Sequence, residues 1–232
     1  MEPSAQPASR PYRSSRREAQ ARLTRQRVLV AATAVFLAHG YAGATIRAIA
    51  SEAGVSVPTV EALFGTKARV LKAAVDVAIA GDDEPVPVLG RSWTDAALRA
   101  QTVDELLAIV AGVIAPAQVR SAGLVLAVFE GSSTDSELAH LLAQLIAQRA
   151  ETAEWLVDGL TRTTRLREGC SRPEAIDTVW VLMDPAVFDR LTRRRHWTVE
   201  HYEAWFARTA RRLLVADAPA PTARATRRRS ST

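Results

Sequence analysis

This sequence of 232 residues contains few side chains that could form disulfides or bind a metal. It contains one cysteine, Cys170, which excludes the intramolecular disulfide framework of a small secreted domain. Its four histidines, at positions 39, 140, 196 and 201, show no spacing typical of a metal site. We find no glycine-rich phosphate loop, nucleophile elbow or paired-carboxylate pattern. We therefore expect no bound metal, no cofactor and no enzymatic activity.

Uninterrupted apolar segments are also missing. Two long stretches without formal charge, residues 28–46 and 106–119, are interrupted by glycines, and the second also by Pro116. Neither supplies the roughly 20 consecutive, predominantly apolar residues that a membrane-spanning helix needs. Residues 1–27 are polar and arginine-rich and lack the apolar core of a secretory signal. These absences disfavour membrane and secreted proteins and favour a cytoplasmic location.

Positive charge is concentrated toward the N-terminus and in both tails. The formal net charge is +5, and arginine supplies most of the positive side chains because lysine occurs only at positions 67 and 72. By segment, the charge is +2 in residues 1–21, +4 in residues 22–80, −4 in residues 81–216 and +3 in residues 217–232. This asymmetry predicts a small polyanion-binding domain at 22–80 joined to a larger body at 81–216. The two ends predict disordered tails, either solvated or touching DNA as basic arms.

Apolar residues recur at helical spacing between these tails, and no useful stretch alternates as a strand would, so we predict an all-α fold. In residues 22–80, Thr45, Ser56 and Thr66 can each cap the start of a helix. Gly40 and Gly54 can each end one. The first domain therefore consists of short, well-delimited helices.

The body is predicted to be a helical bundle. Residues 81–90 break the helical pattern and mark the linker. We expect one helix from about Val103 that Pro116 stops, and another through Phe129. Further helices are expected at about residues 136–164 and after Ser171, Asp184 and Thr198.

Residues 45–64, TIRAIASEAGVSVPTVEALF, predict a helix, a tight turn and a second short helix. Ala50, Gly54 and Val60 supply the small residue, the turn glycine and the buried aliphatic side chain that a helix-turn-helix needs. The second helix of such a unit can enter a major groove about 12 Å wide. The alternative interpretation is an ordinary helical hairpin.

This segment resembles the TetR family of transcriptional repressors, through the pattern AA…F…HGY…TI…IA…AGVS…F…K…L over about residues 25–76. The stretches RLREGCSRPEAIDTVWVL and LTRRRHWTVEHYEAWFARTARRLL are similar to later parts of the family, more weakly. The resemblance implies an N-terminal three-helix DNA-binding domain and a C-terminal helical domain that binds an inducer. It also implies a homodimer, formed through the helices after Ser171 and Thr198, on a near-palindromic DNA operator.

Carried over position by position, the resemblance implies a set of residues nearest DNA. These are Thr45, Arg47, Ser56, Val57, Pro58 and Thr59, with Lys67 on phosphate. The sequence departs from the family at Glu61, where a tyrosine is usual, and at Leu63, where an aromatic or histidine is frequent. A carboxylate at position 61 should repel phosphate, so Glu61 either turns away toward an arginine or weakens backbone binding.

Aromatic residues of the body are candidates for a ligand pocket, with plain core packing as the alternative. The candidate pocket residues are Phe129, Trp155 and Trp180. The candidate dimer residues are Ile176, Val179, Trp180, Tyr202, Trp205, Phe206, Thr209 and Leu213. Glu130 either orients a ligand or faces solvent.

Together these features predict a cytoplasmic, homodimeric, sequence-specific DNA-binding regulator, a repressor released from its operator by a small-molecule inducer. One alternative is an architectural DNA-binding protein that responds to no ligand. Another is a helical enzyme with an appended DNA-binding module, for which the sequence offers no catalytic residues. The inducer, the operator sequence and the regulated genes are not determined by the sequence.

Overall fold

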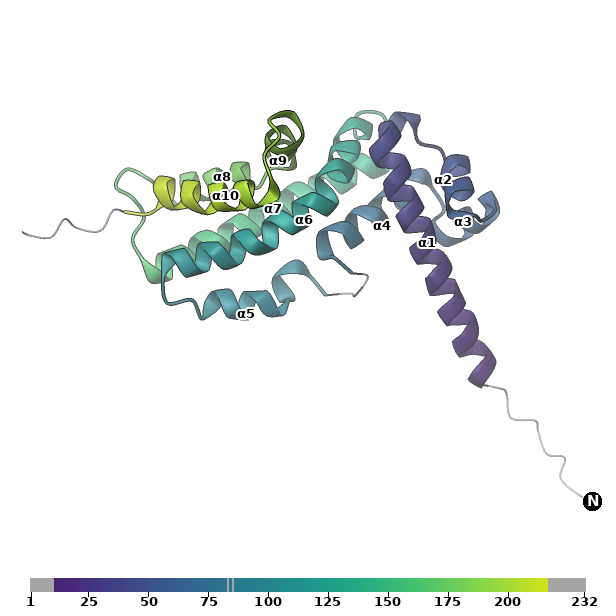
Figure 1. Cartoon of the computed structure of the whole chain (residues 1–232), viewed down its shortest axis with the longest axis horizontal. Helices are drawn as coiled ribbons and strands as arrows, with labels where there is room; N and C mark the ends of the chain where they lie inside the picture. The colour runs from purple at the N-terminus through teal and green to yellow at the C-terminus, as the bar shows by residue number, and fades with distance from the viewer. Residues whose placement is uncertain (1–10, 83, 85, 217–232) are drawn as a thin grey trace, which may run out of the picture.

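The computed structural model describes residues 11–82, 84 and 86–216, and the expected tails at 1–10 and 217–232 lie outside the described residues. The elements are α1 (Pro11–Gly43), α2 (Ile46–Ala53), α3 (Val57–Phe64), α4 (Lys67–Ala80), η1 (Val88–Gly90), α5 (Ser92–Leu98), α6 (Val103–Gly131), α7 (Ser136–Thr163), α8 (Arg172–Leu182), α9 (Pro185–Asp189), η2 (Arg190–Arg194) and α10 (Val199–Leu214). Within the described ranges, β structure is limited to one isolated bridge between Leu166 and Val215. The predicted all-α fold is confirmed (Figure 1).

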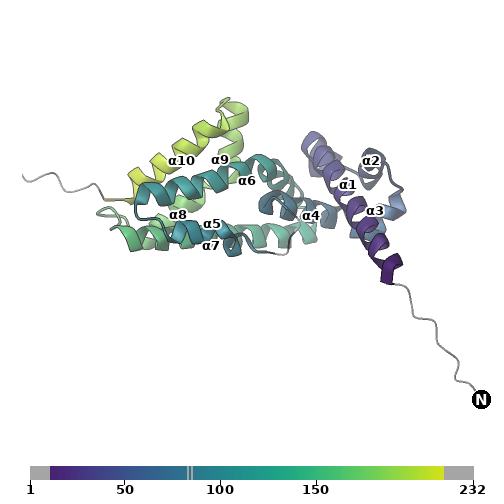
Figure 2. The ribbon, with the colours of Figure 1, turned by 60° about the horizontal axis from the view of Figure 1, so that its bottom comes forward.

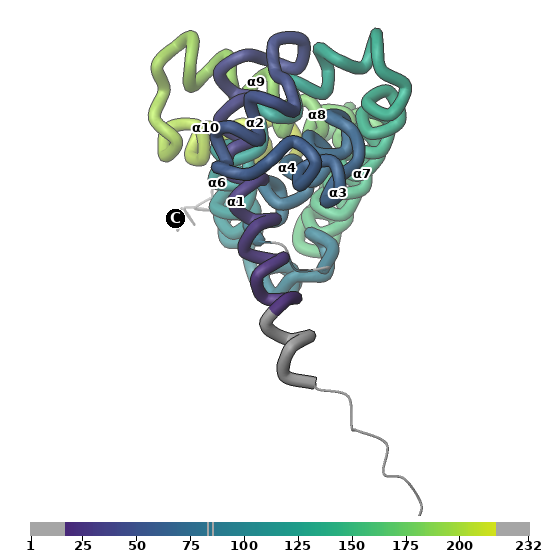
Figure 3. The backbone as a smooth tube through the Cα atoms, turned by 90° about the vertical axis from the view of Figure 1, so that its right-hand side faces the viewer, coloured from purple at the N-terminus to yellow at the C-terminus, as the bar shows by residue number. Residues whose placement is uncertain are grey.

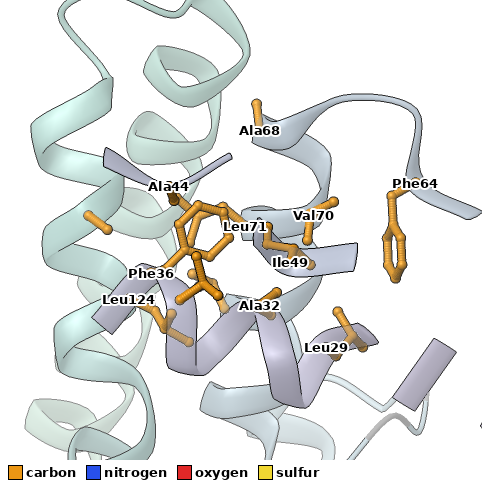
Figure 4. Packing of buried hydrophobic residues seen from close by; sticks show 14 of the residues in the cluster. Leu29, Ala32, Phe36, Ala44, Ile49, Phe64, Ala68, Val70, Leu71 and Leu124 are labelled. Atoms are coloured by element: carbon orange, nitrogen blue, oxygen red, sulfur yellow. The ribbon is translucent and has the colours of Figure 1, made fainter. Parts of the chain in front are cut away.

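Four helices, α1 to α4, form the small domain at one end of the elongated molecule (Figures 1 and 2). Their core contains Phe36 from α1, Ile49 from α2 and Leu71 from α4, each at most 2% exposed (Figure 4). This core does not stop at the expected linker, because Leu124 of α6 and Leu138 of α7 belong to the same buried cluster. The small domain therefore shares apolar packing with the near end of the body.

The long helix α1 differs from expectation at its start. It begins at Pro11, so residues 11–21 are helical, although the sequence predicted a disordered arm up to residue 21. The C-terminal end of α1 lies close to the predicted end at Gly40. Gly40 has φ 66°, a positive value that favours glycine, and one further turn runs to Gly43. Figure 3 shows α1 leaving the body and projecting beyond it.

The body is a bundle built around α6, which packs against α1, α4, α5, α7, α9 and α10. A second buried cluster joins α6, α7, α8 and α10 around Leu106, Leu156 and Phe206. The prediction that Pro116 ends a helix is wrong, because α6 continues through it. A proline inside a helix removes one backbone hydrogen bond and costs about 3 kcal/mol. Apolar burial on both sides of Pro116, at Ala115 and Leu124, offsets that cost.

By length and apolar composition alone, α6 would be long enough and apolar enough to cross a membrane. Its buried face includes Leu106, Val110 and Val128 in the protein core. The packing of α6 against six other described helices accounts for its apolar composition.

Candidate nucleic-acid interface

Side-chain caps delimit the helices of the predicted helix-turn-helix. The Thr45 hydroxyl accepts a hydrogen bond from the Ala48 N–H at 3.1 Å and begins α2. Gly54 ends α2 with φ 62° and ψ 40°, and its N–H donates to carbonyls of the last turn. The Ser56 hydroxyl then accepts from the Thr59 N–H at 3.3 Å and begins α3. The predicted caps at Thr45, Ser56 and Gly54 are confirmed, and they fix the turn between the two helices.

The outer face of this unit carries most of the residues predicted to lie near DNA. Thr45, Arg47, Ser56 and Pro58 are exposed, and Thr59 is half-buried. Val57 differs, because its side chain is half-buried and packs against the domain core. Pro58 is therefore better placed than Val57 to touch a thymine methyl group in a major groove.

Lys67 has a position that the sequence did not predict. Its ammonium group donates to the carbonyls of Tyr41, at 2.8 Å, and Ala44, at 3.1 Å. It also lies 4.0 Å from the centre of the Tyr41 ring. In this structure Lys67 ties the start of α4 to the end of α1, and a contact with phosphate stays a prediction.

Glu61 is exposed on α3 and has no ion pair among the residues that the structure describes. The first half of our hypothesis, in which an arginine draws this carboxylate aside, has no support in this conformation. Leu63, the other departure from the family pattern, packs partly buried against the domain core. The charge at position 61 therefore faces the side of α3 that is open to solvent.

Comparison with known proteins matches residues 28–74 to the model of a family described as bacterial regulatory proteins, tetR family. Those residues include the whole helix-turn-helix. The match supports the resemblance to the TetR family over the small domain. No curated protein matches the sequence.

Solved structures of transcriptional regulators share the fold over most of the chain. FadR from Bacillus subtilis, solved in complex with stearoyl-CoA, has a TM-score of 0.62 at 16% identity and covers 82% of this chain and 97% of its own. A Saccharomonospora viridis protein solved in complex with choline has a TM-score of 0.61 at 19% identity, with coverages of 82% and 97%. A transcriptional regulator from Rhodococcus sp. Rha1 has a TM-score of 0.58 at 18% identity, covering 82% and 95%. These likenesses concern the fold.

Polar contacts join the small domain to α6. The Glu130 carboxylate accepts the backbone N–H groups of Tyr41, at 3.0 Å, and Ala42, at 3.2 Å. These N–H groups follow Gly40, and a Cβ added there would lie 2.5 Å from a Glu130 oxygen. Glycine at position 40 therefore allows the positive φ and leaves room for the Glu130 carboxylate. The sequence did not predict this contact of Glu130.

The ends of α4 are held by the body in the same way. Near its start, the Thr66 hydroxyl donates to Glu137 of α7 at 2.6 Å, and Arg69 forms an ion pair with Glu137 at 3.3 Å. At its end, the Arg120 guanidinium of α6 donates to the Ala78 carbonyl at 2.9 Å. A movement of α6 against α7 would therefore pull on both ends of α4.

Among the residues that the structure describes, the three predicted pocket residues have different packing partners. Trp155 packs edge-on against Trp93, with ring centres 5.1 Å apart, and Arg149 lies over the ring of Trp180 at 4.0 Å. Phe129 is 39% exposed near the end of α6. A cavity of about 230 Å³ lies instead at the domain junction, between α1, α6 and η2, beside Glu130. None of the three predicted aromatic residues lines it.

Part of the predicted dimer surface is wrong. Val179, Tyr202 and Phe206 are fully buried within their own subunit, so they have no surface left for a partner. The helical stripe that we assigned to dimerisation is the core stripe, and Tyr202 also donates its hydroxyl to the Leu182 carbonyl at 3.0 Å. Ile176, Trp180, Trp205 and Thr209 are half-buried, and Leu213 is 46% exposed. These five residues stay candidates for the interface.

Proposed function

We propose that this protein is a homodimeric repressor that a small-molecule inducer releases from a near-palindromic operator. The observation that carries the proposal is the exposed, doubly capped helix-turn-helix, in which α3 begins at Ser56 with Pro58 facing solvent. The domain around it, residues 22–80, has a formal charge of +4, which suits a phosphate backbone.

Dimerisation gives the recognition helices their spacing. Two copies of α3 bound to one face of DNA must lie about one helical turn apart, roughly 34–36 Å. The outer faces of α8 and α10 carry exposed aliphatic side chains, Val181 at 51% and Leu213 at 46%. A dimer formed through these helices would bury both side chains, and this exposure supports that surface as the interface.

Control by a ligand would act through α6. This helix holds α1 through Glu130 and α4 through Arg120, so two arrangements of α6 would place α3 differently. A ligand that binds one arrangement more tightly shifts the population toward it. The relatives solved with choline and with stearoyl-CoA show that proteins of this fold take chemically different ligands, which supports a ligand site here without naming its occupant.

The proposal is tested in three linked measurements on the full-length protein. Light scattering after size exclusion should give twice the mass of 25.1 kDa. Fluorescence anisotropy with a labelled duplex, obtained by selection from genomic fragments, should show two chains per duplex and affinity that falls steeply with salt. Addition of choline or of a long-chain acyl-CoA, as the first probes of a small-molecule panel, tests release. A monomer, or a protein that ignores duplex DNA at low salt, would contradict the proposal.

A pair of variants separates coupling from binding. Glu130→Ala removes the acceptor that links α6 to the end of α1, and should reduce the release of DNA by any active ligand. Glu151→Ala, an exposed carboxylate of α7, removes the same charge from the body and should leave release unchanged. Equal behaviour of the two variants would exclude Glu130 from the coupling.

A further inference from the structure

The N-terminal part of α1 forms an open groove with α3. The groove has a volume of about 550 Å³ and lies beside the exposed face of α3. Its walls include Arg17, Gln20 and Thr24 from α1 and Pro58, Thr59 and Ala62 from α3. Two of these α3 residues, Pro58 and Thr59, are also predicted to lie near DNA, so the groove adjoins the surface that would enter the major groove.

Two arginines fix α1 against the helix-turn-helix and thereby set the position of this wall. Arg27 donates to the Ala53 carbonyl at the end of α2, at 2.6 Å. Arg25 lies over the ring of Phe64 at the end of α3, 4.5 Å from its centre. The helix then continues from Arg25 toward its N-terminal end at Pro11. The turns of α1 that line the groove are therefore held in register with α3.

The polar side chains on the α1 wall suit a phosphate group. Arg17 is exposed and lines the groove, and Gln20 lies on the same wall one turn later. Both carry N–H donors, and neither a carboxylate nor any other acidic group lines the groove. The rest of the lining is mostly apolar, which suits the faces of deoxyribose rings.

We propose that this groove holds one sugar–phosphate strand of the operator, with Arg17 in contact with phosphate, beside the major groove that α3 enters. The inference rests on the proposed DNA-binding function and adds a second element to it. Charge complementarity selects the occupant, because residues 11–27 carry six arginines and one glutamate. Helix α1 would then contact the sugar–phosphate backbone, while α3 contacts base edges in the major groove.

The chain offers a matched control on the same helix. Arg22 is also exposed, but it lies five residues from Arg17, which places it about 140° around the helix and away from the groove. Substitution of either residue by alanine removes one charge from α1. Only Arg17→Ala should remove a phosphate contact.

The experiment measures operator affinity by anisotropy at a series of salt concentrations for wild type, Arg17→Ala, Arg22→Ala and Arg17→Lys. Loss of a phosphate contact lowers the slope of log affinity against log salt by about 1 per subunit, so by about 2 for a dimer. We expect this change for Arg17→Ala, little change for Arg22→Ala, and a slope near wild type for Arg17→Lys. Because phosphate carries no sequence information, Arg17→Ala should weaken operator and random duplexes by the same factor.

Two results would overturn the inference and leave the proposed function standing. One is a wild-type slope in Arg17→Ala, and the other is an equal loss in Arg17→Ala and Arg22→Ala, which would indicate only a general charge effect. Wild-type protein that binds no duplex would instead refute the proposed function itself. Thermal unfolding of each variant confirms that the exposed substitutions leave the fold intact.

Discussion

The hydroxyl of Tyr41 joins the small domain to the body, and the loss of this hydrogen bond should lower the stability measurably. It donates to a carboxylate oxygen of Asp135, the residue that caps α7, across 2.5 Å. The Tyr41 ring is buried and stacks on Phe36, with ring centres 6.3 Å apart. Tyr41→Phe keeps this packing and removes only the donor.

The stability lost in Tyr41→Phe depends on the hydrogen bonds that Asp135 keeps in the variant. A hydrogen bond to a charged group contributes about 1.5–3 kcal/mol. Asp135 keeps two other donors in the variant, the N–H groups of Glu137 and Leu138, so it is not left unpaired. We therefore expect a loss at the low end, about 1.5–2 kcal/mol in the free energy of unfolding. For a protein of this size that corresponds to a fall in Tm of roughly 3–8 °C.

The pH dependence of this loss of stability shows whether it comes from the hydrogen bond between Tyr41 and Asp135. The Tyr41 hydroxyl lowers the pKa of Asp135 in the folded state, and burial, followed by the bond to Asp135, raises the pKa of Tyr41. A lowered carboxylate pKa adds stability that is fully present above the unfolded value of about 3.9 and is lost as the pH falls through the folded value. The difference in stability between wild type and Tyr41→Phe should be constant from about pH 6 to 8 and shrink below about pH 4.

Urea unfolding followed by circular dichroism measures both quantities. Tyr202→Phe is the matched control, because its hydroxyl donates to an uncharged carbonyl, that of Leu182. Its effect should be similar at pH 7 and at pH 4. A Tyr41→Phe variant that matches wild type within about 0.5 kcal/mol, the range of ordinary surface substitutions, would refute the contact between the domains.

Three further substitutions test other parts of the structure. Gly54→Val forces a branched side chain into the left-handed turn at φ 62°, and should cost roughly 1–2 kcal/mol or more in denaturant unfolding and weaken DNA binding; wild-type stability would contradict the turn geometry. Leu124→Ala, at a fully buried position shared by the small domain and α6, should lower the unfolding free energy by about 2–5 kcal/mol, and a smaller loss would show that the two do not share a core. Glu61→Tyr should tighten operator binding in an anisotropy titration, because it removes an exposed negative charge from α3, whereas unchanged or weaker affinity would exclude repulsion at this position.

Local signals in the sequence predicted the helix-turn-helix well. Caps at Thr45, Ser56 and Thr66 and the turn at Gly54 depend on neighbouring residues only, so they are visible without the tertiary structure. The short helix α5 was missed because its seven residues are too few for a clear apolar period.

Errors arose where distant contacts override local preference. Pro116 predicted a helix end, but packing of α6 against six other described helices keeps it continuous. Val179 and Phe206 lie on apolar stripes that fit a dimer surface and a core equally well, and only the folded chain shows that they are core. The contact of Glu130 with the end of α1 spans almost ninety residues, and no sequence period reveals it.

Selection from a randomised duplex library would decide whether α3 reads DNA. The full-length protein, at low salt, is incubated with the library, and bound duplexes are recovered and sequenced over several rounds. We predict enrichment of an inverted repeat whose half-site centres lie about 10 base pairs, or a multiple of that spacing, apart. Recovery of sequences that are indistinguishable from the input library would contradict the helix-turn-helix interface described above.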